Sequence, residues 1–145
     1  NTIESNDSFG FGPHLMLDLN DCDPELLNDY NYCFKLLFEL PDKVGMTRIT
    51  QPYVFPYSGL VPEDEGITGV VIIAESHISI HTFPKKKYAF IDAFSCKDFD
   101  VEKVKEFFID AYKSKDPQSF YVERGLKFPR ESTAKKRESE DDRAA

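Results

Sequence analysis

Three kinds of reactive side chain lie close together in an otherwise apolar region of this chain. The segment Glu75-Ser76-His77 carries a hydroxyl and an imidazole, His81 adds a second imidazole, and Cys96 adds a thiol. A serine hydroxyl can act as a nucleophile and an imidazole as a general base near neutral pH. Taken singly, such residues are more often ordinary strand serines, core histidines and small buried cysteines. Their spacing as a group favours a catalytic site.

The residues around this group resemble a known family. The pattern is Glu-Ser-His followed by Ile-His-Thr, an aromatic residue and proline, and here it runs from Glu75 to Pro84. It is similar to the proenzyme form of bacterial and archaeal S-adenosylmethionine decarboxylase. The resemblance covers most of the chain in the family's order, through Gly12-Pro13-His14-Leu15-Met16-Leu17-Asp18, Leu26-Leu27-Asn28-Asp29, Thr68-Gly69-Val70-Val71, Cys96 and Glu123-Arg124-Gly125.

The resemblance implies that the chain cuts itself between residues 75 and 76. Ser76 Oγ would attack the carbonyl of Glu75 and convert the peptide bond into an ester, a reaction that needs a strained backbone and a polarised carbonyl. Thr68 stands where the family carries a hydroxyl residue that assists this step, and His81 would then remove the Cα proton of residue 76. The cofactor implied is a covalent pyruvoyl group made from Ser76.

The same resemblance implies an amino-acid decarboxylase. The pyruvoyl ketone takes the substrate's α-amine as a Schiff base and accepts the electrons left when carbon dioxide departs, as pyridoxal phosphate does in other enzymes. The family pattern assigns protonation of the resulting carbanion to Cys96. A thiol with the ordinary pKa of about 8.5 is largely protonated at pH 7, which is the form that a proton donor needs.

Two departures from the family concern the substrate site. Members that use S-adenosylmethionine carry a glutamate after the aromatic-proline pair, and this chain has Lys85, which cannot accept hydrogen bonds from ribose hydroxyls. Between Phe55, which resembles the aromatic that stacks on adenine, and Thr68, the chain is longer by several residues. The added residues include the acidic run Glu63-Asp64-Glu65.

These departures favour a small basic amino acid as the substrate. L-arginine or L-ornithine has an α-amino acid end and a distant cation that the acidic run could receive, although a solvated surface loop is the plain alternative. The alternative function is an S-adenosylmethionine decarboxylase that supplies the aminopropyl donor for spermidine. A second alternative is an inactive paralogue that regulates an active partner, and uncut native chain would favour it.

Composition limits the class of protein. The 145 residues, of which 41% are hydrophobic, suit one domain with its own core. A net charge of −8 argues against nonspecific binding to nucleic acid or to an anionic membrane. Cys22 and Cys33 match no metal or redox spacing and are interpreted as structural. Without a disulfide framework, a signal peptide or an apolar run that could span a bilayer, we expect a cytoplasmic protein that holds no metal.

Hydrophobic periodicity predicts an α+β two-layer sandwich. Residues 23–41 read as a helix that begins with Asp23 as N-cap and Pro24 in the first turn and ends at Pro41, and residues 101–112 read as a second helix. We expect an antiparallel sheet with both helices on one face. Its strands are expected over residues 11–19, 47–55, 69–74, 76–83, 88–95 and 118–123.

The expected organisation is one catalytic domain with two polar ends. Residues 1–10 are polar and expected to be loose, residues 11–125 form the decarboxylase domain, and the charged residues 126–145 are expected to be a disordered tail. The family fold implies that a second copy of the chain covers the other face of the sheet. We therefore expect a homodimer of processed protomers, with a small-molecule substrate bound near the interface.

Overall fold

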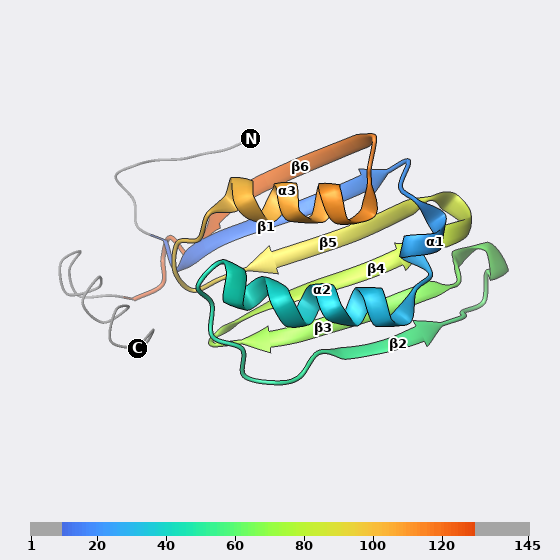
Figure 1. The fold of residues 1–145 in the computed structure, drawn as a ribbon. Helices are drawn as coiled ribbons and strands as arrows, with labels where there is room; N and C mark the ends of the chain where they lie inside the picture. The colour runs from blue at the N-terminus through green and yellow to red at the C-terminus, as the bar shows by residue number, and fades with distance from the viewer. Residues whose placement is uncertain (1–9, 130–145) are drawn as a thin grey trace.

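The computed structural model describes residues 10–129, which form a six-stranded sheet with helices on one face (Figure 1). The order across the sheet is β2-β3-β4-β5-β1-β6, and every neighbouring pair is antiparallel. The predicted α+β sandwich is therefore confirmed. The elements in chain order are β1 (Gly12–Asn20), α1 (Pro24–Leu27), α2 (Tyr30–Lys43), β2 (Tyr53–Tyr57), the 3-10 turn η1 (Pro62–Asp64), β3 (Gly66–Ile73), β4 (Ser76–Phe83), the 3-10 turn η2 (Pro84–Lys86), β5 (Tyr88–Phe94), α3 (Val101–Tyr112) and β6 (Asp116–Arg124).

The core lies between the sheet and helices α2 and α3. Strand side chains alternate between the two faces, so every second residue of β1 points toward the helices. Leu15, Leu17 and Leu19 of β1 are almost fully buried, as are Leu37 of α2 and Phe108 of α3. This alternation explains why the strands and helices form two layers with one apolar interior.

The first helix differs from the prediction. It is two helices, because Asp23 caps α1 and Asp29 caps α2 with a side-chain oxygen that accepts a backbone N–H. Helix α2 continues through Pro41 to Lys43, so the predicted end at Pro41 is wrong by two residues. Proline lacks only its own N–H, and the residues that follow it here still find carbonyl acceptors in the last turn.

Other element boundaries differ from the prediction where pairing between strands, rather than local sequence composition, determines where a strand begins. Strand β4 and helix α3 have the predicted bounds, 76–83 and 101–112. The second strand begins at Tyr53, and Arg48 makes only an isolated bridge to Ile73. Strand β3 begins at Gly66, where the backbone approaches Thr82 so closely that an ideal Cβ would lie 1.9 Å from the Thr82 carbonyl oxygen. Glycine at this position allows β3 to extend past the predicted start.

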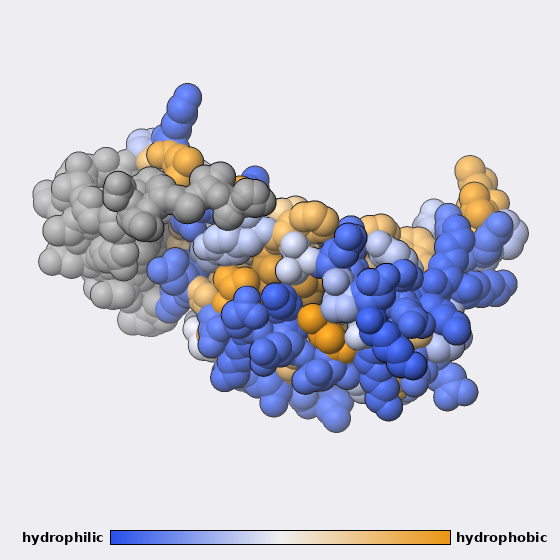
Figure 2. Space-filling model, turned by 90° about the horizontal axis from the view of Figure 1, so that it is seen from above, coloured by the Kyte–Doolittle hydropathy of each residue, from blue (hydrophilic) through white to orange (hydrophobic). Residues whose placement is uncertain are grey.

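The face of the sheet opposite the helices, called here the open face, is rich in apolar side chains. Within residues 10–129 no helix covers it (Figure 1). Figure 2 shows the molecule from above, with hydrophilic side chains crowding the lower side and hydrophobic groups along the concave upper margin. Such an apolar area on a small protein is typical of an interaction surface. Its members are between 37% and 55% exposed: Tyr53, Phe55, Ile72, Phe90 and Phe120.

The chain after β6 begins with an ordered turn. The Phe128 N–H donates to the Gly125 carbonyl at 2.9 Å, and the Phe11 and Phe128 rings lie 4.8 Å apart between centroids. Residues 126–129, the start of the expected tail, thus fold back against the first strand. The rest of that tail, 130–145, and most of the expected loose start, 1–9, lie outside the described residues. None of the helices in the described part is long and apolar enough to cross a bilayer.

Candidate active site

The turn between β3 and β4 presents the predicted cleavage bond. Glu75 occupies the left-handed region with φ of 59°, which is rare for a residue with a side chain and costs about 1 kcal/mol or more. Ser76 begins β4 and is only 8% exposed. Its Oγ accepts a hydrogen bond from the Cys96 backbone N–H at 2.7 Å. A serine hydroxyl is thus held beside a strained peptide bond, as the ester rearrangement requires.

Cys96 follows the end of β5 and reaches the same turn. Its thiol donates a hydrogen bond to the Ala74 carbonyl at 3.4 Å, so sulfur and hydroxyl both lie next to the cleavage bond. The backbone at Ser95 and Cys96 packs closely against β1 only because residue 12 is glycine. An ideal Cβ on Gly12 would lie 1.7 Å from the Ser95 carbonyl oxygen. Glu75, Ser76 and Cys96 form what we call the cleavage half-site.

A cavity of about 220 Å³ opens beside the cleavage half-site. Its walls include the loop after α2, with Met46 and Ile49, together with Ile73 and Lys97 of the neighbouring segments. The sequence did not indicate the loop residues, since none carries a group that does chemistry. Only the pairing of segments that are far apart in the chain reveals them.

The predicted base lies on the open face, paired with the predicted hydroxyl residue. Thr68 of β3 and His81 of β4 are direct partners in the sheet register, and Thr68 Oγ1 lies 3.3 Å from His81 Nδ1. Phe55 of β2 is the partner of Thr68 on the other side, and its ring is half exposed. Thr68 and His81 form what we call the base half-site.

A single chain does not bring the two half-sites together. Ser76 and His81 are five residues apart on β4, a separation of about 17 Å at the usual rise per residue. An odd number of steps along a strand also places two side chains on opposite faces. Ser76 accordingly points to the buried side, and His81 is exposed on the open face.

The predicted substrate residues lie at the end of the sheet that holds the base half-site. A cavity of about 500 Å³ is lined by Thr68, His81, Tyr57, Phe83 and Asp64, among others. The acidic run forms η1 and its C-terminal boundary, packed against η2. This end of β4 lies about 23 Å from Ser76 along the strand.

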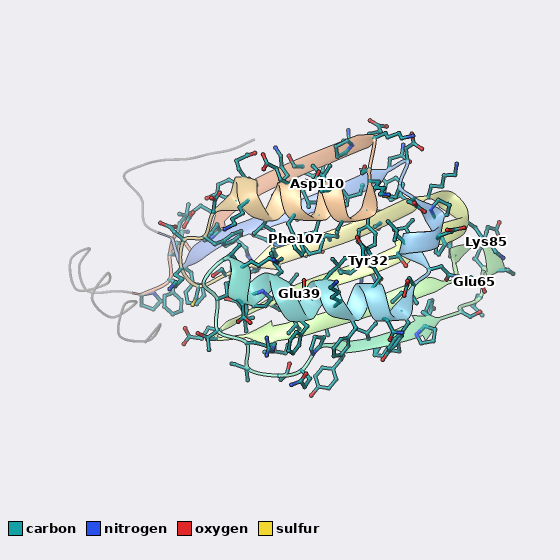
Figure 3. All side chains as sticks on the ribbon, in the orientation of Figure 1. Tyr32, Glu39, Glu65, Lys85, Phe107 and Asp110 are labelled. Carbon is teal, nitrogen blue, oxygen red and sulfur yellow. The ribbon has the colours of Figure 1, made fainter. Side chains whose placement is uncertain are left out.

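The acidic run and the lysines of η2 pair with each other. Lys85 Nζ lies 3.3 Å from Glu65 Oε2, and Lys86 Nζ lies 2.8 Å from Asp64 Oδ1. Figure 3 shows the Glu65 and Lys85 side chains together at one end of the sheet. The sequence suggested that the acidic run could bind the distant cation of a basic amino acid. Two of its three carboxylates instead have lysine partners within the chain.

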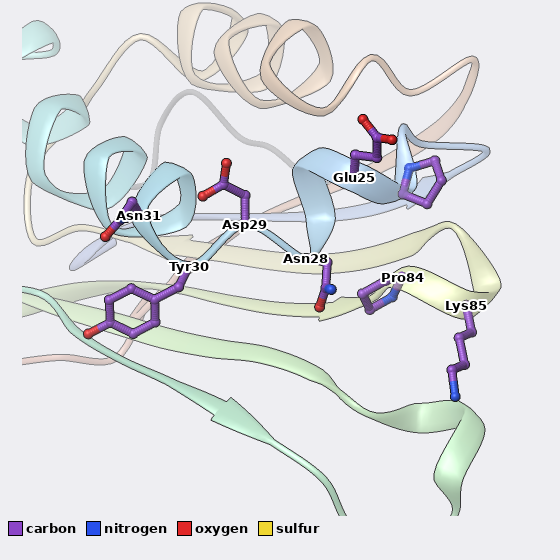
Figure 4. A pocket seen from close by; sticks show the side chains of 8 residues that line it. Glu25, Asn28, Asp29, Tyr30, Asn31, Pro84 and Lys85 are labelled. Carbon is purple, nitrogen blue, oxygen red and sulfur yellow. The ribbon is translucent and has the colours of Figure 1, made fainter.

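A third hollow, of about 720 Å³, lies on the helix side between α1, the start of α2 and η2. Figure 4 shows Glu25 and Asp29 on one side of it and Lys85 on the other, with the lysine amine directed away from both acids and toward the η1 loop. The hollow contains neither Ser76 nor His81. We therefore do not assign it to the active site.

Sequence reasoning missed a group of polar residues on the open face. His14 Nε2 lies 3.2 Å from Asp92 Oδ1, and the His77 and His14 rings both lie against Phe94. Burial lowers the pKa of His77, with the nearby His14 acting in the same direction. His77 points away from Ser76, as the next residue along the strand must, and this favours a structural role.

The other two cysteines are buried in the core. Burial raises the pKa of both Cys22 and Cys33 to about 11. The Cys33 sulfur lies 3.0 Å from the Tyr112 hydroxyl, and Cys22 donates to the Leu19 carbonyl. These contacts agree with the structural interpretation. Among residues 10–129 no group of His, Cys, Asp and Glu side chains could hold a metal ion.

Comparison with known proteins gives one family. The sequence pattern described as S-adenosylmethionine decarboxylase matches residues 13–125. The S-adenosylmethionine decarboxylase proenzyme of Pyrococcus furiosus is 35% identical over 116 residues, which is 79% of each chain. That of Thermodesulfovibrio yellowstonii is 32% identical over 121 residues, 81% of this chain and 84% of the relative. The crystal structure of the adenosylmethionine decarboxylase from Aquifex aeolicus has a TM-score of 0.71 at 26% identity and covers 87% of this chain and 99% of that chain.

The fold and the cleavage half-site define a class of enzyme: a decarboxylase that makes a covalent pyruvoyl group from an internal serine. Within this class, the chain belongs to the S-adenosylmethionine decarboxylase family. The residues present fit the pyruvoyl group. The serine follows a strained residue, lies at a strand end, and has a backbone N–H directed at its oxygen.

Proposed function

We propose that this protein is a self-processing decarboxylase of S-adenosylmethionine. The observation that carries the proposal is the contact between the Ser76 hydroxyl and the Cys96 amide at the strained turn of Glu75. The relatives are named S-adenosylmethionine decarboxylase proenzyme, a name that states the substrate and a precursor form. The cleavage half-site supplies the bond to be cut after Glu75, the nucleophile Ser76 and the proton donor Cys96, all from one chain.

The residues of the chain have distinct tasks in processing. The Oγ of Ser76 attacks the carbonyl carbon of Glu75, forming a carbon–oxygen ester bond while the carbon–nitrogen bond breaks. His81 removes the Cα proton of residue 76, and the Glu75 carboxylate then leaves with the former Oγ. Imidazole suits this task, because its neutral form is available near pH 7. The pyruvoyl group supplies an electron sink for decarboxylation when it is present.

His81 acts on the Ser76 of a second copy of the chain. The two residues of one chain lie about 17 Å apart and on opposite faces of the sheet, so His81 cannot reach its own Ser76 without unpairing β4. The open face carries both the base half-site and the exposed apolar side chains. In the proposed homodimer, which buries this face, His81 of one protomer meets the other protomer at the β3–β4 turn, the end of the sheet where Ser76 begins β4.

The first test of the proposal concerns the substrate. Processed protein is expected to release labelled carbon dioxide from carboxyl-labelled S-adenosylmethionine, and little from L-arginine or L-ornithine. The reason is that the lysines of η2 already neutralise the charge of Asp64 and Glu65, and a cationic amino acid would need that charge. Release from either amino acid and none from S-adenosylmethionine would contradict the substrate. A chain that stays uncut in its native form would instead support a regulatory paralogue.

The second test concerns Cys96. A Cys96→Ala chain is expected to be cut normally and to lose decarboxylase activity by about a hundredfold or more, because a positioned proton donor contributes that much. Cys96 donates the proton that replaces the carboxylate on the substrate's α-carbon. The measurements are intact mass for processing and carbon dioxide release for turnover. The matched control is Cys33→Ala, which removes a thiol at the α2 contact with Tyr112. Sustained full activity of Cys96→Ala would assign this cysteine a structural role only.

A further inference from the structure

The cavity beside the base half-site contains one carboxylate. Asp64 lines it together with Thr68 and His81, and the rest of the wall is largely aromatic and aliphatic, with Tyr57, Phe83 and the loop residues Leu60 and Val61. Its volume of about 500 Å³ lies within the usual range for small-molecule sites. An apolar wall with one acidic group suits a ligand that has a flat apolar ring and hydroxyl donors beside it.

The Asp64 carboxylate is held in place by a neighbouring cation. Lys86 Nζ lies 2.8 Å from Asp64 Oδ1, and the hydrogen bond to Asp64 raises the pKa of Lys86. An ionised carboxylate offers about four lone-pair sites, so one lysine contact leaves acceptors for further donors. The Lys85–Glu65 pair lies next to it and fastens the same loop to η2. Two ion pairs between the same short segments restrict the loop more than either pair would alone.

S-adenosylmethionine presents neutral donors that match this arrangement. The 2′ and 3′ hydroxyls of its ribose are adjacent, and a carboxylate can accept a hydrogen bond from each. The sulfonium is a poorer match, because Lys86 would repel it. The ribose is therefore the part of the substrate that Asp64 suits.

We propose that Asp64, held in position by Lys86, accepts the hydrogen bonds of the ribose hydroxyls of an S-adenosylmethionine molecule whose α-amine is bound at residue 76 of the second copy. Asp64 is thus a substrate-binding residue, and Lys86 is a positioning residue that acts through it. The residue that follows the aromatic-proline pair, Lys85, does not bind the ribose, and its part is to anchor Glu65. This inference rests on the proposed function, since it assumes that the substrate carries a nucleoside.

The test uses nucleosides that the enzyme cannot decarboxylate. Binding of 5′-methylthioadenosine and of its 2′-deoxy counterpart to the processed protein is measured by calorimetry. The unmodified protein is expected to prefer the ribose form by about tenfold or more, the value of a hydrogen bond to a charged group. Asp64→Asn should reduce this preference to near one. Asp110→Asn, the same change on the exposed side of α3 (Figure 3), should leave it intact.

Lys86→Gln provides a second variant that leaves the carboxylate in the chain. It should weaken the preference for ribose in part and raise the KM for S-adenosylmethionine more than it lowers kcat. An unchanged preference in Asp64→Asn overturns the role of Asp64, while turnover of S-adenosylmethionine by the same sample keeps the proposed function. Absence of both nucleoside binding and turnover in the unmodified protein removes the proposed function and this inference together.

Discussion

A Ser76→Ala chain is expected to remain whole and to show no decarboxylase activity. The substitution removes the only oxygen that can attack the Glu75 carbonyl from the adjacent residue, and with it the precursor of the pyruvoyl group. The unmodified chain should instead give two fragments, one that ends at Glu75 and one that begins with the blocked residue 76. Intact mass after prolonged incubation under native conditions distinguishes the two results.

The control for this substitution must separate chemistry from folding. Alanine removes the hydroxyl that accepts the buried Cys96 N–H, and the loss of such a buried hydrogen bond costs about 1 to 3 kcal/mol of stability. Thermal unfolding should therefore show a folded but less stable chain. Ser119→Ala on the edge strand β6 removes a hydroxyl from an exposed residue and should be cut normally. Cleavage of Ser76→Ala at the same bond would rule out Ser76 as the nucleophile.

The second large effect is expected in mixed dimers. One tagged chain carries Ser76→Ala and the other, with a different tag, carries His81→Ala. Neither chain alone should form the pyruvoyl group, and the His81→Ala chain should stop at the ester, which hydroxylamine cleaves. In dimers that carry both tags, the intact Ser76 of one chain meets the intact His81 of the other. The His81→Ala chain should therefore be processed, although it lacks the base itself.

Processing of the mixed dimers depends only on which chain supplies His81. If His81 acts within its own chain, mixed dimers remain unprocessed in both subunits, and intact mass shows no pyruvoyl-blocked fragment. A variant on the open face away from the base half-site, Phe120→Ala, tests the surface itself. Loss of its exposed ring should weaken the dimer and slow processing at low protein concentration.

The elements with strong local signals were predictable from the sequence. Strand β4 alternates regularly and α3 has an apolar stripe at helical spacing, so both bounds were predicted correctly. The break between α1 and α2 was not predicted, because the apolar stripe runs across it. The pairing of Lys85 with Glu65 depends on the path of a loop and on two 3-10 turns that local composition does not specify.

The sequence indicated which residues belong to the proposed site, and it indicated only in part that they lie in two separate places on the chain. The residue types at Ser76, His81 and Cys96 indicated the chemistry. The five-residue spacing between Ser76 and His81 already implied opposite faces of one strand, since side chains alternate with period two. What the sequence could not provide was the contact between Ser76 and Cys96, which depends on how β5 ends against β1. Long-range packing of this kind has no local pattern.

The strand order has a consequence for the mature enzyme. Cleavage at the proposed bond after Glu75 would divide the chain so that β1, β2 and β3 belong to one fragment and β4, β5 and β6 to the other. In the order β2-β3-β4-β5-β1-β6 strands of the two fragments are intermixed, and three of the five strand pairings join one fragment to the other. The two fragments of the cut protein are therefore expected to remain associated through strand pairing, without a covalent link between them. Once unfolded, the cut protein must reassemble by a second-order encounter of two pieces, and it cannot return to the precursor from which it formed.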